Sequence, residues 1–301
     1  MDPGRADVRR EPGRDARLIT LPELPQMQAL AERIQDWLGD ATFEGYVPLG
    51  FSGLKTAVPS PDELIGRTLR RVGRRAKYVI LEFDGTPERR VIFHLSQAGR
   101  VDFETPPKST KPKGSVVRWK FSDNRAVLVR EFGTERKAGW WVLGPGDDGP
   151  LESLGPEVTS EEFAQWLRSS DDGRRVHTIL RDQRTVAGVG RGYADDALHR
   201  AKLSPYASLK SLTADERERL LAAIIAVLDD GLDRERTRSG GLSQNKLGEH
   251  FTVHGKAGLP CPECGEDLRR VSYESHEVVY CPRCQTGGKV LADRRLSRLV
   301  K

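Results

Sequence analysis

Four cysteines, arranged as two similar pairs, constrain the fold of this 301-residue chain more than any other feature. The pairs Cys261-Pro-Glu-Cys264 and Cys281-Pro-Arg-Cys284 are separated by 16 residues. Two such turns at this separation are typical of a zinc ribbon, in which four thiolates surround one structural zinc ion. Two disulfides or four buried free thiols are the alternative, but the cysteines cluster in a chain without a secretory signal. The alternating residues between the pairs predict a β-hairpin.

The chain is basic, with a formal net charge of +5 and a pI near 9.0. Six basic residues and no acid lie within residues 66–81, and five basic residues with one acid lie within residues 289–301. Such runs indicate a polyanionic partner, with a solvated surface as the common alternative. No stretch approaches the roughly 20 apolar residues of a transmembrane helix. We therefore expect a cytoplasmic protein with no membrane partner.

Hydrophobic periodicity divides the chain into a β-rich half and a helical half. Apolar residues at helical spacing predict a helix from about Met27 to Gly39. The strongly polar residues 1–21 predict disorder. Between and beyond these segments the pattern predicts strands over 78–83, 91–95, 116–121 and 126–129, a linker over 144–150, helices over 160–167, 176–180 and 212–228, and a mobile polar loop over 234–250.

Several short motifs in this chain occur together in one known family. They are PELP at 22–25, RRAKY at 74–78, HLSQAG at 94–99, DQRTVAGVG at 182–190 and YADDAL at 193–198. With the cysteine spacing, the segment from 22 to about 285 resembles the formamidopyrimidine-DNA glycosylase and endonuclease VIII family of base-excision repair enzymes. The resemblance implies an α+β fold with two lobes. An N-terminal antiparallel β-sandwich with a leading helix would precede a helix–two-turns–helix lobe with a zinc-ribbon β-hairpin.

The resemblance also implies a domain organisation and a partner. Residues 1–21 would be a disordered extension or a mis-assigned start, 22–150 the β-sandwich catalytic lobe, 151–250 the helix–two-turns–helix DNA-binding lobe, 251–288 the zinc finger and 289–301 a basic tail. Damaged double-stranded DNA would bind a monomer between the lobes, in the bacterial nucleoid. A zinc-ribbon module from transcription or translation is a more distant alternative, and the long β-rich half argues against it.

In this family the catalyst is the secondary amine of an N-terminal proline, which matches Pro22, and Glu23 matches the glutamate that moves protons. The resemblance implies attack on C1′ of the damaged nucleotide, then β/δ-elimination through a Schiff base. In the chain as written Leu21 acylates Pro22, and an amide nitrogen is not a nucleophile. We therefore expect that the functional chain starts at Pro22. The alternatives are a non-catalytic damaged-DNA binding protein and a plain proline-led helix start.

The same resemblance assigns six further residues to DNA. Lys77, His94, Arg191 and His276 match residues that hold phosphates, and Gln97 and Arg136 match residues that fill the gap left by a flipped nucleotide. No phenylalanine occupies the wedge position, which leaves the preferred lesion open. The short loop at 234–250 favours oxidised pyrimidines, ring-opened bases or bulkier adducts. From the residues alone, Gly188-x-Gly190 predicts a turn whose amides approach a phosphate, or a plain turn between helices.

Overall fold

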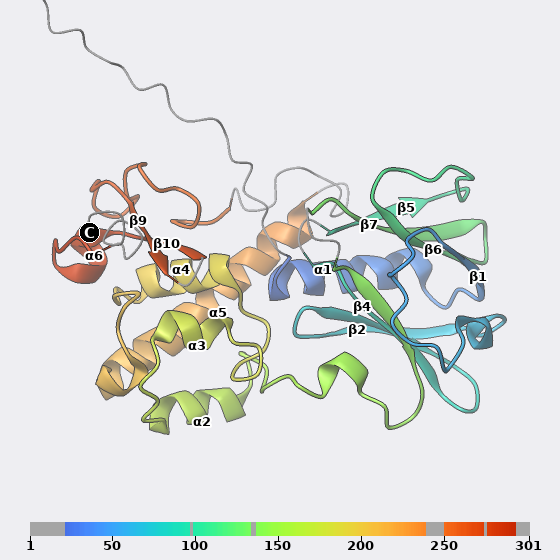
Figure 1. Ribbon diagram of the computed structural model, residues 1–301, viewed down its shortest axis with the longest axis horizontal. Helices are drawn as coiled ribbons and strands as arrows, with labels where there is room; N and C mark the ends of the chain where they lie inside the picture. Colours follow the sequence, from blue (N-terminus) through green and yellow to red (C-terminus); the bar gives the residue numbers. More distant parts are fainter. Residues whose placement is uncertain (1–21, 97–98, 134–136, 239–249, 274–275, 293–301) are drawn as a thin grey trace, which may run out of the picture.

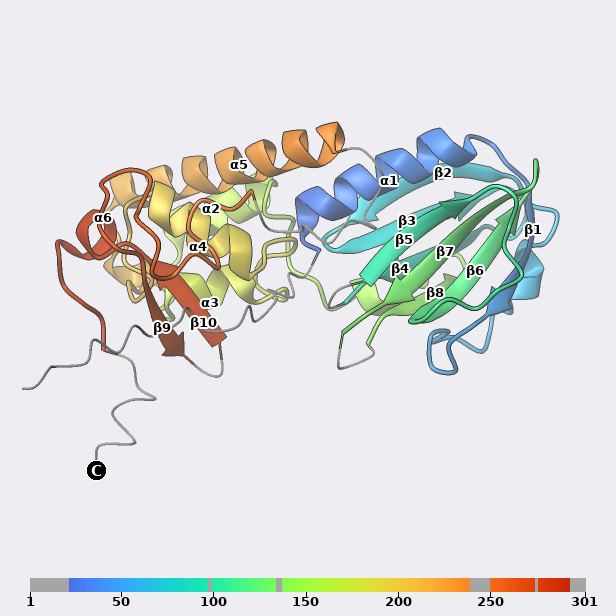
Figure 2. The same ribbon diagram turned by 90° about the horizontal axis from the view of Figure 1, so that it is seen from above.

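The computed structural model of the protein describes residues 22–96, 99–133, 137–238, 250–273 and 276–292. These residues form a β-rich lobe and a helical lobe, which lie side by side (Figure 1). Helix α1 (Leu24–Leu38) belongs to the β-rich lobe and packs against helix α5 (Ala214–Thr237) of the other lobe (Figure 2). Among the described helices, none has both the length and the apolar character needed to cross a membrane.

The β-rich lobe is a sandwich of two four-stranded antiparallel sheets with the orders β1-β6-β7-β5 and β2-β3-β4-β8. Aromatic side chains join the sheets: the ring centroids of Phe93 and Trp119 are 5.2 Å apart, and those of Trp119 and Trp140 are 5.7 Å apart. The elements are β1 (Phe43–Pro48), η1 (Pro61–Leu64), β2 (Leu69–Arg75), β3 (Tyr78–Phe83), β4 (Arg89–His94), β5 (Gly99–Glu104), β6 (Ser115–Phe121), β7 (Arg125–Glu131), β8 (Gly139–Leu143) and η2 (Gly149–Leu151).

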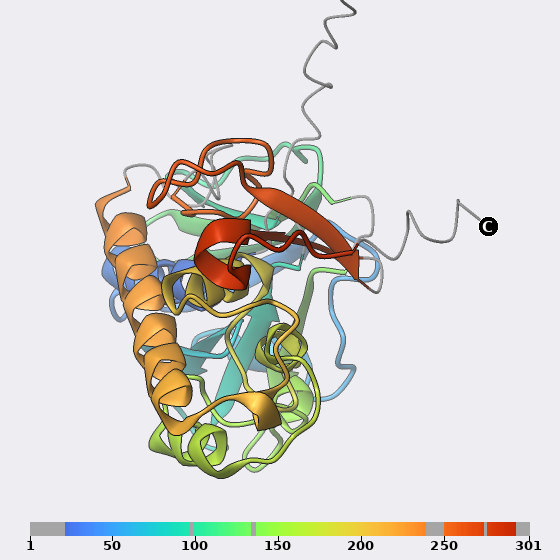
Figure 3. The ribbon, with the colours of Figure 1, turned by 90° about the vertical axis from the view of Figure 1, so that its left-hand side faces the viewer.

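The helical lobe surrounds a second core and carries the cysteine-rich hairpin at one end (Figure 3). Its long helix α5 begins with a capping box, in which the Thr213 hydroxyl accepts from the Glu216 amide at 3.3 Å. The other elements are α2 (Glu161–Ser169), α3 (Val176–Arg181), α4 (Arg191–Arg200), η3 (Leu209–Ser211), β9 (Arg269–Tyr273), β10 (His276–Tyr280) and α6 (Pro282–Thr286).

The sequence prediction of a polar loop over 234–250 is wrong at its start. Helix α5 continues to Thr237, and Arg236 in its last turn forms an ion pair with Glu32 of α1 at 2.7 Å. These polar residues resemble a loop when only the sequence is considered, but in the structure they contact a partner from the other lobe. Residues 239–249 of the predicted loop lie outside the described residues.

A second ionic contact joins the lobes through Glu157, which lies just before α2. Its carboxylate accepts from Arg74 at 2.9 Å and from Arg75 at 2.7 Å, and also from the amide of Ala76. Burial alone would raise the pKa of Glu157, but the two guanidinium groups outweigh it and lower the pKa. We call the contact of Glu157 with residues 74–76 the Glu157 clamp.

Replacing Glu157 with Gln is expected to lower the free energy of unfolding by about 2 kcal/mol, because two partly buried guanidinium groups would lose their charged acceptor. Urea denaturation followed by tryptophan fluorescence measures this change. The control is Glu161→Gln, which removes an exposed carboxylate 3.3 Å from Arg168. It should change the unfolding free energy by less than about 0.5 kcal/mol. Equal losses in the two variants would contradict a specific role of the Glu157 clamp.

Candidate active site

The start of α1 places Pro22 and Glu23 against the helical lobe. Both residues are buried, and Glu23 is only 3% exposed. One carboxylate oxygen of Glu23 accepts from the Gly192 amide at 3.0 Å, and the other accepts from the Gly190 amide. These amides lie at the positively polarised N-terminus of α4, where an anion is stabilised. A carboxylate of one lobe therefore caps a helix of the other, which fixes its position.

The turn before α4 depends on two glycines. Gly188 has a φ of 110°, a region that favours glycine; its amide donates to Gln183 Oε1 at 3.0 Å, and its carbonyl accepts from the Leu24 amide at 3.1 Å. A Cβ atom at Gly190 would overlap the carboxylate of Glu23, so the close approach requires glycine there. The amides of Gly188 and Gly190 thus bind Gln183 and Glu23. The prediction that they approach a phosphate is wrong.

A buried polar network continues from Glu23 into the helical lobe. The Glu23 amide donates to Gln26 Oε1 at 3.0 Å, and Gln26 Nε2 donates to the Tyr193 hydroxyl at 2.9 Å. Burial raises the pKa of Tyr193 well above its usual range, and this hydroxyl lies 3.0 Å from His250 Nε2. Sequence reasoning missed Gln26 and Tyr193. The Glu-x-x-Gln spacing at a helix start was the available signal for Gln26.

A cavity of about 400 Å³ lies beside Pro22, at the boundary between the lobes. It brings together three predicted site residues: Pro22, Lys77 in the β2–β3 turn and His94 at the end of β4. The full lining comprises Pro22, Lys77, Tyr78, His94, Leu95 and Ser96 of the β-rich lobe and Ser153, Leu154, Asp182, Gln183 and Arg184 beyond it. We call this space the interlobe cavity.

Positive charge gathers around Lys77. Burial is the largest effect and lowers the pKa of Lys77; the Glu23 carboxylate opposes this shift, while Arg181 and Arg191 add to it. Arg181 ends α3 and Arg191 begins α4, so two cations of the helical lobe act on an amine of the β-rich lobe. The predicted phosphate-binding residues Lys77 and Arg191 therefore belong to one electrostatic group.

His94 is held in an aromatic setting. Its ring centroid lies 5.3 Å from that of Tyr78 and 5.6 Å from that of Trp141. Burial lowers the pKa of His94 to about 4, and the positive charge of Lys55 adds to the effect. At neutral pH the imidazole is therefore uncharged, and it retains one N–H that can donate to a phosphate oxygen.

The other predicted DNA-binding residues are only partly described. Gln97 and Arg136 lie outside the described residues. The backbone of His276 opens β10 opposite Tyr273, while its side chain lies outside the described part of the chain. Within the basic run 66–81, the arginines of the Glu157 clamp hold the lobes together, so only part of this run is available to a polyanion.

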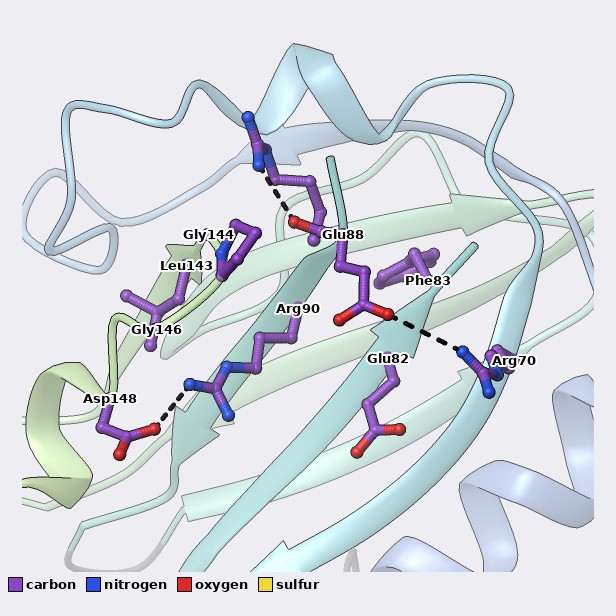
Figure 4. Close-up of a pocket in the computed structure, with 11 residues that line it drawn as sticks. Arg70, Glu82, Phe83, Glu88, Arg90, Leu143, Gly144, Gly146 and Asp148 are labelled. Atoms are coloured by element: carbon purple, nitrogen blue, oxygen red, sulfur yellow. Dashed lines mark hydrogen bonds and ion pairs between the residues drawn. The ribbon is translucent and has the colours of Figure 1, made fainter. Parts of the chain in front are cut away.

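A second cavity, of about 320 Å³, lies along the β2-β3-β4-β8 sheet (Figure 4). Four of its charged side chains pair with one another: Arg90 with Asp148 at 2.6 Å and Arg70 with Glu88 at 4.0 Å. None of the predicted site residues lines it. Because three predicted site residues meet in the interlobe cavity, it is the better candidate for an active site.

The four cysteine sulfurs lie within 4.8 Å of one another, at the base of the β9–β10 hairpin. Cys261 and Cys281 are buried, and the Cys284 amide donates to Cys281 Sγ at 3.4 Å. Four thiol donors in one cluster fit a structural metal ion. His199 of α4 places Nε2 3.3 Å from Cys261 Sγ, a contact that the cysteine spacing did not reveal.

Two buried aspartates of α4 bind backbone amides of residues 251–288, which we call the cysteine-rich unit. Asp196 accepts from the backbone amides of Thr252 and Val253 at 2.6 and 2.9 Å. Asp195 accepts from the amide of Val279 in β10 at 3.2 Å and lies 2.7 Å from Nδ1 of His254. The helix that Glu23 caps at its start is therefore bonded to the cysteine-rich unit further along.

Comparison with known proteins places this arrangement in a family. Residues 21–141 match the formamidopyrimidine-DNA glycosylase N-terminal domain, and residues 151–241 match the H2TH domain of the same enzymes. The formamidopyrimidine-DNA glycosylase of Heliobacterium modesticaldum is 31% identical over 282 residues, covering 88% of this chain and 100% of the relative. This chain belongs to the formamidopyrimidine-DNA glycosylase family. Membership excludes the alternative of a transcription or translation module.

Other relatives of this glycosylase-family chain agree with the fold. An uncharacterized formamidopyrimidine-DNA glycosylase-like protein of Mycobacterium tuberculosis is 39% identical over 152 residues, covering 50% of this chain and 95% of the relative. A Lactococcus lactis Fpg (MutM) structure, solved with DNA containing N7-benzyl-Fapy-dG, has a TM-score of 0.75 at 24% identity and covers 88% of this chain and 100% of its own. The predicted two-lobed fold class is thereby confirmed.

Proposed function

We propose that this chain is a bifunctional DNA glycosylase and abasic-site lyase acting on double-stranded DNA that contains damaged bases or abasic sites. The observation that carries the proposal is the interlobe cavity, where Pro22, Lys77 and His94 meet beside Glu23. A structural neighbour supports the substrate class: Lactococcus lactis Fpg has been crystallised with abasic-site DNA. Oxidised pyrimidines, ring-opened bases and bulkier adducts are the candidate lesions.

The proposed mechanism assigns a role to each predicted site residue. The lesion is flipped out of the duplex, and the secondary amine of Pro22 attacks C1′, so that the damaged base leaves. Glu23 moves the protons, and the resulting Schiff base permits β/δ-elimination of the strand. The DNA contacts are divided between phosphate binding by Lys77, His94, Arg191 and His276, and filling of the vacated space by Gln97 and Arg136.

Zinc is the metal that the cysteine cluster would hold. Cys261, Cys264, Cys281 and Cys284 would bind one ion, which when bound supplies a structural crosslink. The crosslink would join the two cysteine turns that flank the β9–β10 hairpin, so the phosphate contact assigned to His276 would depend on it. The basic segment 289–301 would add further phosphate contacts.

The amine mechanism requires a free nitrogen on Pro22. We therefore propose that the active form begins at Pro22, with residues 1–21 absent. The family match begins at residue 21, which supports this start. We further propose a monomer that acts in the bacterial cytoplasm, at the nucleoid. If Pro22 stays acylated, the alternative is a damaged-DNA binding protein without proline chemistry, which the Leu21–Pro22 bond of the written sequence favours.

Borohydride trapping on abasic-site duplex tests the proline mechanism. The chain that begins at Pro22 is expected to form a reduced covalent adduct, and peptide mass mapping should place it on the Pro22 nitrogen. The matched control is the same chain acetylated at its N-terminus, which keeps every side chain and should lose that adduct. If the chain with a free Pro22 amine binds the duplex but gives no adduct on Pro22, the proline mechanism is contradicted. The damaged-DNA binding protein would then be the supported function.

A further inference from the structure

We propose that Lys77 is a second amine nucleophile of this site, which forms a Schiff base with the aldehyde of an abasic site while Pro22 remains acylated. The inference rests on the proposed function, since it uses the same DNA and the same interlobe cavity. It gives the full chain, with Leu21 bonded to Pro22, an abasic-site lyase activity of its own.

The first support is where the amine lies. Lys77 and Pro22 line one cavity, together with His94 and with Gln183 and Arg184 of the other lobe. A sugar that is placed within reach of the Pro22 nitrogen thus enters the space that Lys77 lines. Within the described part of the chain, no carboxylate forms an ion pair with Lys77.

The second support is the rigidity of the segment that presents Lys77. Arg75 pairs with Tyr78 across β2 and β3, so Ala76 and Lys77 alone form the turn. Ala76 has a φ of 53°, an uncommon value for a residue with a side chain. Its carbonyl accepts from Arg74 at 3.0 Å and its amide donates to Glu157, so the Glu157 clamp holds this turn. An amine on a braced turn can be aimed at a bound sugar.

The third support is electrostatic. Burial and the charges of Arg181 and Arg191 lower the pKa of Lys77, whereas Glu23 opposes this shift. The carboxylate of Glu23 is engaged by the amides of Gly190 and Gly192. A lowered pKa increases the neutral fraction of the amine, and only the neutral amine can attack a carbonyl carbon.

The chemical step balances without a further reagent. The Nζ lone pair of Lys77 attacks C1′ of the ring-opened sugar, and the carbinolamine takes up one proton from solvent and loses water to give a protonated imine. Water then accepts a C2′ proton, the electrons of that C–H bond form the C2′–C3′ double bond, and the C3′–O bond breaks with its electron pair leaving on the 3′ phosphate. Water finally hydrolyses the imine and releases Lys77.

The test uses the full chain of residues 1–301 with abasic-site duplex and borohydride. We expect a covalent adduct that peptide mapping places on Lys77. Lys77→Arg keeps the positive charge for phosphate binding, but a guanidinium stays protonated and cannot form the imine. Because Lys77 is also assigned to phosphate binding, the variant and the parent are compared at protein concentrations that saturate a tetrahydrofuran-site duplex, and there the variant should lose the adduct. Lys55→Met, which removes an exposed lysine near His94, should keep it.

The outcomes separate this inference from the proline mechanism. An adduct of the full chain on any other amine, no adduct from the full chain, or an adduct that persists in Lys77→Arg would each overturn the role of Lys77. The chain that begins at Pro22 and carries Lys77→Arg tests the proposed function independently. An adduct on its Pro22 nitrogen would support the proline mechanism even where the full chain gives none.

Discussion

A Glu23→Gln variant of the chain that begins at Pro22 is expected to excise damaged bases about 10²–10⁴-fold more slowly, the range that a positioned acid–base group contributes. Glutamine keeps the size of the side chain but cannot take up or release the proton. It also places an amide NH₂ where two backbone amides, those of Gly190 and Gly192, need acceptors. Single-turnover excision from a duplex with a ring-opened purine measures the rate.

The control for this variant is Glu32→Gln on the same helix. Glu32 pairs with Arg236 at 2.7 Å and does not line the interlobe cavity. Its removal should leave the excision rate within about twofold of the parent, since an exposed ion pair contributes little to the fold. Similar losses in the two variants would indicate weakened lobe contact in place of lost proton transfer, and an unchanged rate in Glu23→Gln would contradict the acid–base role.

Regular apolar periodicity made part of the fold predictable from the sequence. Helix α1 and strand β3 were predicted because their apolar residues repeat at the spacing of a helix and of a half-buried strand. Strand β2 was missed because Leu69–Arg75 contains four arginines, which resemble a surface charge run. Two of these arginines are compensated by Glu157, which is 82 residues from Arg75. No local pattern records a contact of that separation.

The candidate site, like the fold, could be predicted only in part from the sequence. The resemblance to a known family identified Pro22, Lys77 and His94, and the structure then placed them around one cavity. The pairing of Glu23 with Gly190 was not predicted, because these residues lie 167 positions apart and the carboxylate occupies the amides that had been assigned to a phosphate. The sequence therefore predicts which residues belong to the site. It does not predict which group each polar side chain binds, because that depends on how the two lobes pack together.

Replacing Cys281 with Ser is expected to abolish metal binding and to unfold the cysteine-rich unit, residues 251–288, while both lobes stay folded. A serine hydroxyl does not supply the thiolate that completes the cluster. The described part of the unit has two small buried clusters, one of five residues around the cysteines (Val253, Cys261, Leu268, Val279 and Cys281) and one of three in the hairpin (Val271, Val278 and Tyr280). Units of this size depend on the metal, whose binding contributes about 10–16 kcal/mol in zinc-finger peptides.

Metal analysis of the purified variant and limited proteolysis after residue 250 measure this effect. All five tryptophans of the chain lie before residue 167, so their fluorescence reports on the lobes and not on the cysteine-rich unit. We expect unchanged tryptophan emission, new cleavage in the unit and at least a tenfold weaker affinity for abasic-site duplex, which corresponds to about 1.4 kcal/mol. Chelation of the parent should reproduce the loss, and added zinc should restore the parent but not the variant.

The loss should also extend into α4, because Asp195 and Asp196 would lose backbone donors in the cysteine-rich unit. Both carboxylates are buried, and buried acceptors without donors are costly. Since Glu23 caps the same helix from the other lobe, metal loss should slow base excision as well as weaken binding. An apo protein that binds weakly but excises at the parental rate from saturated complexes would show that α4 keeps its position without the metal, and that the unit serves DNA binding alone.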